Sequence, residues 1–192
     1  TPQEFFAAHM EIAEQDMSTA WVAGIIAVHA FQLAIMAEQA REDVYSAGPD
    51  TLISSSYNPV GGKVEICDGG FMLSGRWGWS SGSAHCTWVL LGAIIPGEGY
   101  RTFLVPRSDY EIEDTWFVYG LQATGSNDIV IDKPVFVPDH RTHKQMDGFA
   151  CVNEQENPIY SIPWAQMFIR VVSTPAIGAV KHAVNLFAGK AD

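Results

Sequence analysis

The sequence predicts an α+β chain of more than one domain, in which helices come first, short strands follow, and helices return at the end. Apolar residues recur at helical spacing up to residue 49, alternate with polar residues over 50–138, and return to helical spacing after residue 158. The 192 residues are also 47% hydrophobic and only 17% charged, which supplies a real core and excludes a disordered chain. We therefore expect helical domains over 1–49 and 158–192, a β domain over 50–138, and a polar linker over 139–157.

The first helix is marked by its start signal. Thr1-Pro2-Gln3-Glu4 has the pattern of a capping box with Pro at the first helical position, which predicts a short helix directly after it. Ser18 or Thr19 can then cap a second, longer helix. That helix should continue to about Tyr45, where Ala47-Gly48-Pro49 ends it.

One stripe of the second helix carries a candidate base. It consists of Trp21, Ile25, His29 and Gln32, which are spaced at i, i+4, i+8 and i+11. A lone His on an apolar stripe is more often a core residue bonded to the backbone than a base. If the stripe faces a pocket, His29 is the best general-base candidate, because an ordinary imidazole titrates near neutral pH.

The region from residue 50 to residue 138 is expected to be a β domain. Its alternating segments are separated by Gly-, Pro- and Asp-rich turns, and such spacing is typical of an antiparallel barrel or sandwich. The predicted strands are Thr51–Tyr57, Lys63–Cys67, Phe71–Ser74, Cys86–Ile95, Arg101–Pro106, Tyr110–Thr115, Ile129–Asp132 and Val135–Pro138. Helical spacing then returns in Trp164–Val172 and Pro175–Ala188. The apolar face of the last helix consists of Ala176, Ala179, Val180, Ala183, Val184 and Phe187.

Charge and cysteine content limit the partners and the compartment. Eleven Lys and Arg against 22 Asp and Glu give a net charge of −11, without the basic stripe that a nucleic acid or an anionic membrane requires. The longest apolar run, Trp21–Phe31, is interrupted by His29 and is too short to span a bilayer. The three Cys show no CxxC pair, and no secretory signal is present, so we expect reduced thiols and a cytoplasmic location. The His and Cys spacings predict no metal site, and His140 and His143 should lie on the exposed linker.

Three polar clusters are candidate binding segments. Ser74–His85 contains two Trp, four Ser and three Gly. Its backbone could therefore approach a flat ligand closely, while a Trp side chain stacks on that ligand. The competing interpretation is a hairpin corner that packs against the helices. Ser54-Ser55-Ser56 at a strand end offers hydroxyl groups, or is simply solvated. Gly120–Asp128 could bind an anion or form a long turn, and it lacks the residues of a P-loop. No GxSxG motif supports a hydrolase.

Three segments in the same order resemble one family. Ser18-Thr19-Ala20-Trp21-Val22-Ala23-Gly24 through Val28-His29 looks like the middle helical segment of the oxygenase components of two-component flavin-dependent aromatic monooxygenases, which have the acyl-CoA dehydrogenase fold. Ser74-Gly75-Arg76-Trp77-Gly78-Trp79-Ser80-Ser81-Gly82 resembles their second flavin segment. Gly120–Asp128 followed by Val135-Phe136-Val137-Pro138 is similar to the loop and strand that close their β domain. The resemblance covers nearly the whole chain.

This resemblance implies a definite architecture. It implies N-terminal helices, a central antiparallel β barrel over 50–138, and a C-terminal helical bundle that begins in 158–192. Because family members are about twice as long, we expect the chain to be the middle of a larger subunit that forms a homotetramer. The resemblance adds a flavin and an aromatic substrate to the expected partners, but no metal, nucleic acid or membrane.

The resemblance also implies roles for single residues. Trp21 matches a Trp that lines the flavin and substrate pocket, and His29 matches a His that contacts the phenol oxygen of the substrate. Ser55, or its neighbour Ser56, matches a Ser near the flavin and the substrate. The segment Trp79-Ser80-Ser81-Gly82 matches the one along the flavin ring, with Ser81 or Ser80 placed to bond the flavin N5.

The implied activity is hydroxylation of a phenolic or polycyclic aromatic substrate by O₂ through a flavin C4a-hydroperoxide. Reduced flavin, FMNH₂ or FADH₂, would come from a separate NAD(P)H flavin reductase. An FAD-dependent acyl-CoA dehydrogenase has the same fold and remains an alternative, although the helix with Trp21 and His29 and the Ser-Tyr-Asn-Pro segment argue against it. A third alternative is a non-catalytic fragment that serves as a scaffold within such a subunit.

Overall fold

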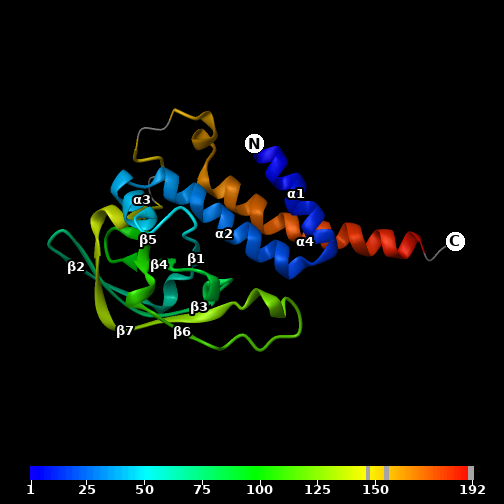
Figure 1. The fold of residues 1–192 in the computed structure, drawn as a ribbon. Coiled ribbons are helices and arrows are strands. Elements are labelled where there is room, and N and C mark those ends of the chain that lie inside the picture. Colours follow the sequence, from blue (N-terminus) through cyan, green and yellow to red (C-terminus); the bar gives the residue numbers. More distant parts are fainter. Residues whose placement is uncertain (146–147, 154–155, 190–192) are drawn as a thin grey trace.

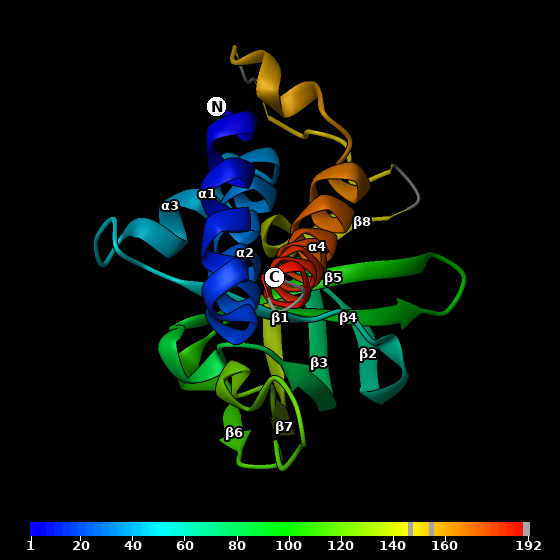
Figure 2. The same ribbon diagram turned by 90° about the vertical axis from the view of Figure 1, so that its right-hand side faces the viewer.

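The structure, a computed structural model, describes residues 1–145, 148–153 and 156–189, so residues 146–147 and 154–155 of the predicted linker and 190–192 of the predicted last domain lie outside the described residues. The helices are α1 (Pro2–Gln15), α2 (Met17–Ile35), α3 (Glu38–Tyr45) and α4 (Trp164–Ala188). They lie together on one side of the strands (Figures 1 and 2). Figure 1 shows α2 and α4 lying along each other, with α1 beside them. The predicted order, in which helices come first, strands follow and helical structure returns at the end, is confirmed.

The strands form two four-stranded sheets, with orders β1-β4-β5-β8 and β2-β3-β7-β6. Their bounds are β1 Ile53–Ser56, β2 Gly62–Cys67, β3 Gly70–Ser80, β4 Trp88–Ile95, β5 Gly99–Pro106, β6 Glu111–Glu113, β7 Asn127–Pro138 and β8 Thr142–Lys144. The main core lies between the two sheets and includes Trp77, Phe103 and Ile129, all nearly inaccessible to solvent. The indole of Trp77 also donates to Gly92 O at 2.7 Å, which joins one sheet to the other.

The predicted closed, antiparallel barrel is wrong, because the two sheets are stacked rather than closed into a ring. Within the described part of the chain, each sheet has its own two edge strands. The pair β1–β4 is moreover parallel, with Ile53 opposite Trp88. Between β1 and β4 the chain forms β2 and β3 of the other sheet. This long crossover connection allows β4 to run in the same direction as β1.

The second helix is shorter than predicted and has a different cap. Its N-cap is Asp16, whose Oδ1 accepts from Thr19 N at 2.6 Å, instead of Ser18 or Thr19. It ends at Ile35, because Asn153 donates its side-chain amide to the carbonyls of Ala34 and Met36, and Val152 N donates to Ile35 O. These bonds satisfy carbonyls that a continuing helix would have used, so α3 begins as a separate helix.

The predicted linker is more structured than expected. It contains β8, which pairs with β5, and His143 is 2% exposed instead of lying on the surface. His140 is half-buried beside Asp43 of α3. The two helices predicted after residue 163 are one, α4, which continues through Pro175. Beyond Gly178 its apolar side chains are exposed, and Figure 1 shows this end of α4 extending past the other elements.

Helix α2 is the central helix of the helical layer. By length and composition alone, Met17–Ile35 is apolar enough to cross a membrane, which differs from the expectation drawn from Trp21–Phe31. However, 61% of its most apolar window is buried inside the structure, against α1, α4 and β1. Its composition is therefore that of a core helix, and it carries residues of the site described below.

Asp43 should make the stability of the fold sensitive to strong acid. Its carboxylate accepts from Arg141 Nε at 2.6 Å and lies 2.7 Å from His140 Nε2. Burial raises the pKa of Asp43, but the bonds from Arg141 and His140 outweigh it and hold the pKa below its ordinary value of 3.8. This stabilisation is present above that value and is lost as the pH falls through the lowered pKa. Between pH 5 and pH 2, the Tm of Asp43→Asn should therefore decrease less than the Tm of the wild type. Equal decreases in Tm would contradict this role of Asp43.

Candidate active site

A cavity of about 310 Å³ lies where α2, β1, β3 and α4 meet. It is lined by Trp21, Ile25, Ser55, Ser56, Tyr57, Asn58, Gly78, Trp79, Ser81, Phe168 and Val172. Cavities of this size hold small organic ligands, usually with apolar and aromatic walls and a few polar groups. Trp21, Ser55, Ser56, Trp79 and Ser81 of the predicted site are therefore brought together, from segments that are far apart in the sequence.

The end of β3 is irregular, because its register against β7 shifts between Trp77 and Ser80. Trp79 has a left-handed backbone, with φ of 66°, and its side chain is 70% exposed while it lines the cavity. Gly82 is also left-handed, with φ of 69°, and a Cβ there would lie 2.9 Å from Val22 Cγ1 of α2. Only glycine fits such a close approach with this φ. Gly82 therefore allows the backbone that follows β3 to pack closely against α2, although Gly82 itself does not line the cavity.

Ser81 is held by a set of hydrogen bonds. Its Oγ accepts from Trp21 Nε1 at 3.0 Å and lies 2.8 Å from Ser126 Oγ. Ser126 Oγ lies 2.7 Å from Thr124 Oγ1, which donates to Leu121 O at 2.8 Å. All three hydroxyl residues are less than 9% exposed. The loop of residues 121–126 thus positions Ser81, which directly follows β3, and through it Trp21 of α2.

The remaining serines divide into two groups. Ser55 and Ser56 both line the cavity, and Ser56 Oγ donates to Gly78 O at 2.5 Å, which links β1 to β3. Ser80 is fully buried, and its hydroxyl donates to Ser54 Oγ at 3.2 Å, away from the cavity lining. Of the two serines that the resemblance left open for the same role, Ser81 is thus the one at the cavity.

His29 is fully buried and does not line the cavity. Its Nδ1 lies 2.9 Å from Ile53 O, so Nδ1 carries the proton, and Nε2 is buried without a hydrogen-bond partner. Burial lowers the pKa of His29 to about 4, against a smaller raising effect of the bond to Ile53. The ring is therefore neutral near pH 7, with a bare acceptor at Nε2. It meets Tyr57 edge to face, with ring centroids 5.9 Å apart.

Tyr57 is a cavity residue that sequence reasoning missed as a candidate. Its hydroxyl donates to Gln32 Oε1 at 2.6 Å, and Gln32 Nε2 donates to Thr102 Oγ1 at 3.3 Å. Burial, and to a lesser extent Tyr100, raises the pKa of Tyr57 well above its ordinary value, so the group stays a donor. Its position directly after the Ser54-Ser55-Ser56 cluster was the available signal. Ser126 and Thr124 lie within the Gly120–Asp128 cluster, which was noted without a role for either residue.

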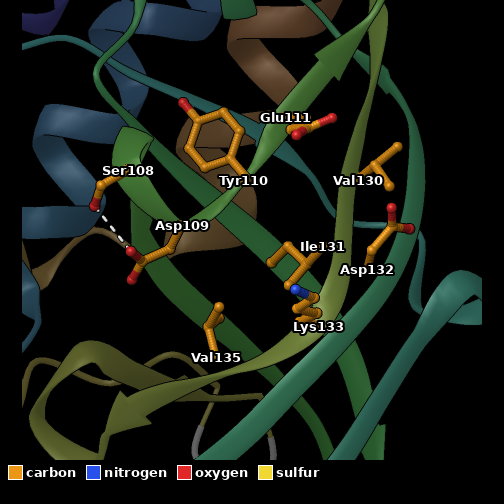
Figure 3. Close-up of a pocket in the computed structure, with 9 residues that line it drawn as sticks. All are labelled: Ser108, Asp109, Tyr110, Glu111, Val130, Ile131, Asp132, Lys133 and Val135. Atoms are coloured by element: carbon orange, nitrogen blue, oxygen red, sulfur yellow. Dashed lines mark hydrogen bonds between the residues drawn. The ribbon is translucent and has the colours of Figure 1, made fainter.

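A second cavity of about 390 Å³ lies on the sheet of order β2-β3-β7-β6, at β6 and β7. Figure 3 shows carboxylates of Asp109, Glu111 and Asp132 around it, with Lys133 among them and the Tyr110 hydroxyl turned away. No residue of the predicted site lines it. Among the residues that the structure describes, no group of three His, Cys, Asp or Glu is arranged to hold a metal ion, here or elsewhere.

Comparison with known proteins reveals clear relatives. The chain is 41% identical over 185 residues to the oxygenase subunit HsaA of a flavin-dependent monooxygenase from Mycobacterium tuberculosis (strain CDC 1551 / Oshkosh), which covers 92% of this chain and 46% of that protein. It is 44% identical over 143 residues to the oxygenase component of an FADH(2)-dependent resorcinol hydroxylase from Rhizobium sp. (strain MTP-10005), which covers 72% of this chain and 34% of that one. No family model matches the chain.

The fold agrees with this result. The crystal structure of 3-HSA hydroxylase from Rhodococcus sp. RHA1 superimposes with a TM-score of 0.86 at 39% identity, over 94% of this chain and 48% of that one. The chain thus spans about half the length, or less, of the relatives that it matches. By sequence and by fold, it belongs to the oxygenase components of the two-component flavin-dependent monooxygenases, which have an acyl-CoA dehydrogenase-like fold.

Proposed function

We propose that the protein uses reduced flavin and O₂ to hydroxylate a phenolic or polycyclic aromatic compound. The observation that carries this proposal is the cavity between α2 and β3, where aromatic walls and serine hydroxyls converge. The relatives named as flavin-dependent and FADH(2)-dependent oxygenase components support it. An oxygenase component implies a second protein, an NAD(P)H flavin reductase, that supplies the reduced flavin.

The residues of the cavity fit a flavin ring. Trp21, Trp79 and Phe168 offer flat apolar surfaces, and Ser55, Ser56 and Ser81 offer polar atoms at the edge of the same space. A flat ring system with heteroatoms along one edge needs this combination of stacking and hydrogen bonding. When bound, reduced flavin supplies the electrons that activate O₂.

The side chains of this chain would then have distinct tasks. Trp79 would stack on the ring, Trp21 and Ile25 would exclude water from it, and Ser81 would offer its hydroxyl to it. His29 would accept a hydrogen bond from the phenol hydroxyl at its bare Nε2, which makes the ring more electron-rich and so more reactive toward an activated oxygen. Because Tyr57 bounds the cavity and contacts His29, this role requires Tyr57 to turn away when the substrate binds.

The proposed assembly is a homotetramer. The exposed apolar side chains on the last part of α4 support it: Ile177, Val180, Val184, Leu186 and Phe187 are all at least 49% exposed. Such a surface is typical of a helix that packs against further helices. Light scattering of the full-length protein measures the number of subunits directly.

The function is tested by anaerobic titration of the full-length protein with FMNH₂ and FADH₂, followed by mixing with O₂ and a panel of phenols. We expect binding of at least one reduced flavin and formation of a hydroxylated phenol. Trp79→Leu should weaken flavin binding by about five-fold, the order of one aromatic contact. Phe117→Leu is the matched control, because Phe117 is 81% exposed and does not line the cavity.

Two results would contradict the proposal. One is a protein that binds neither reduced flavin. The other is a yellow protein with tightly bound FAD that is reduced when an acyl-CoA is added, which would identify a dehydrogenase.

A further inference from the structure

We propose that the Tyr57 side chain occupies the place of the substrate phenol when the site is empty, and that a bound phenol displaces it and replaces it as the hydrogen-bond partner of the buried amide of Gln32. This inference rests on the proposed function, because it takes the substrate to be a phenol that reaches His29. It gives Gln32, which does not line the cavity, a part in recognising the substrate.

Tyr57 connects the cavity with the buried His29. It lines the cavity, and its ring meets the His29 imidazole edge to face, with 5.9 Å between the ring centroids. Helix α4 contributes Trp164 and Phe168, whose rings also meet the Tyr57 ring edge to face, at 6.3 Å and 5.4 Å between centroids. The space among these three aromatic side chains is therefore shaped for a ring, and the ring that fills it is itself a phenol.

The Tyr57 hydroxyl is bound by a side chain that solvent does not reach. Gln32 is 0% exposed, and its Oε1 accepts from the Tyr57 hydroxyl at 2.6 Å. Its Nε2 donates to Thr102 Oγ1 at 3.3 Å. Gln32 lies three residues after His29 on α2, so the two side chains lie on the same face of the helix, and both contact Tyr57.

His29 and Gln32 can serve one substrate hydroxyl together. The bare Nε2 of the neutral imidazole can only accept, so it would take the proton of the hydroxyl as a hydrogen bond. Gln32 would then turn its amide so that Nε2 donates to the phenol oxygen. Thr102 permits this turn, because its hydroxyl can donate to Gln32 Oε1 as well as accept from Nε2.

Displacement of Tyr57 requires only a rotation of its side chain. The backbone is held in place, because Tyr57 O accepts from the Tyr100 hydroxyl at 2.9 Å and the preceding Ser56 donates to Gly78 O at 2.5 Å. The rotation breaks the bond to Gln32, and a buried amide oxygen without a partner is unfavourable. A phenol restores that bond and a hydrocarbon ring does not, so the site should prefer the phenol.

The test compares p-cresol with toluene, which have the ring structures of the Tyr and Phe side chains and differ only in the hydroxyl. Isothermal titration calorimetry gives both dissociation constants for the full-length wild type, Tyr57→Phe and Gln32→Leu. In Tyr57→Phe the ligand has no hydrogen bond to break, so both molecules should bind about five-fold more tightly than to the wild type. In Gln32→Leu the preference for p-cresol over toluene should fall by about five-fold, as for one lost hydrogen bond.

Tyr110→Phe is the matched control. It removes a tyrosine hydroxyl that is buried without a hydrogen-bond partner, and Tyr110 does not line this cavity. Both dissociation constants should keep their wild-type values in this variant. A general loosening of the fold would weaken the binding of both molecules, whereas the expected result for Tyr57→Phe is a gain for both.

The outcomes separate this inference from the proposed function. If Tyr57→Phe binds both molecules as the wild type does, or if Gln32→Leu keeps the wild-type preference, the inference is wrong. It is also wrong if neither the wild type nor Tyr57→Phe binds p-cresol. In each of these cases the proposed function stands as long as the wild type binds reduced flavin and hydroxylates a phenol. If the wild type does neither, the proposed function fails and the inference fails with it.

Discussion

Acidification from pH 6.5 to pH 4 should lower the free energy of unfolding by about 3 kcal/mol through His29 alone. Burial lowers the pKa of His29 in the folded protein from 6.5 to about 4, and the weaker opposing effect of the Ile53 carbonyl does not restore it. The difference of about 2.5 pKa units, at about 1.4 kcal/mol each, gives this magnitude.

The direction follows from proton binding in the two states. Between pH 6.5 and pH 4 the unfolded chain binds a proton at this imidazole and the folded protein does not, so lower pH favours unfolding. Above pH 6.5 both states are neutral, and below pH 4 both are charged, so the change is confined to this window. It is separate from the effect of Asp43, whose pKa lies below 3.8 in the folded protein.

The matched variant is His29→Asn. Its side-chain amide can still donate to Ile53 O, but it does not titrate. Urea unfolding at pH 7, 6, 5 and 4.5 should show a steeper loss of stability for the wild type than for His29→Asn. Parallel pH profiles of the two proteins would show that His29 is charged, or exposed, in the folded state.

The elements that were predicted well are those whose signals lie close together in the sequence. The capping box at Thr1 and Glu4 is confirmed, with the two side chains and backbone groups paired as the motif requires. The alternation of apolar residues located β1 to β7, although two of the predicted strands are the single strand β7. Local propensity and patterning determine such elements, so one sequence is sufficient.

The elements that were missed depend on distant partners. Nothing near Met36 signals the end of α2, because the groups that satisfy its carbonyls come from Val152 and Asn153. In the same way, no local signal makes β1 parallel to β4 or places His143 in the core. These features follow from how the chain packs, which periodicity does not encode.

The same distinction between local signals and distant contacts applies to the candidate site. The clusters around Ser55 and Ser81 could be identified because hydroxyl, glycine and tryptophan residues are concentrated in short segments. The position of Ser81, rather than Ser80, at the cavity depends on the irregular end of β3, and the contact of Tyr57 with His29 depends on the packing of α2 on β1. The sequence therefore indicated the segments, and the structure shows which of their side chains line the cavity.

The clearest functional effect should come from His29→Asn in the full-length protein. The variant is expected to keep the bond to Ile53 O but lacks the bare acceptor at Nε2, so it removes the group that would accept a hydrogen bond from the phenol. We expect the rate of phenol hydroxylation to fall by about ten-fold, the order of one hydrogen bond lost in the transition state. Reduced flavin should bind as it does to the wild type, since His29 does not line the cavity. The electrons should then leave as H₂O₂.

Ser81→Ala provides the complementary measurement, because Ser81 lines the cavity and His29 does not. It should weaken the binding of reduced flavin and raise the ratio of H₂O₂ to hydroxylated product even where flavin is saturating. Stopped-flow mixing with O₂, with product and H₂O₂ quantified together, separates the two defects.

The His29 imidazole is already neutral above its pKa of about 4. Titration of His29 should therefore cause no change in the wild-type ratio of H₂O₂ to hydroxylated product between pH 6 and pH 8. Wild-type coupling in both variants would remove His29 and Ser81 from the mechanism and leave the cavity as a binding site whose chemistry depends on other residues.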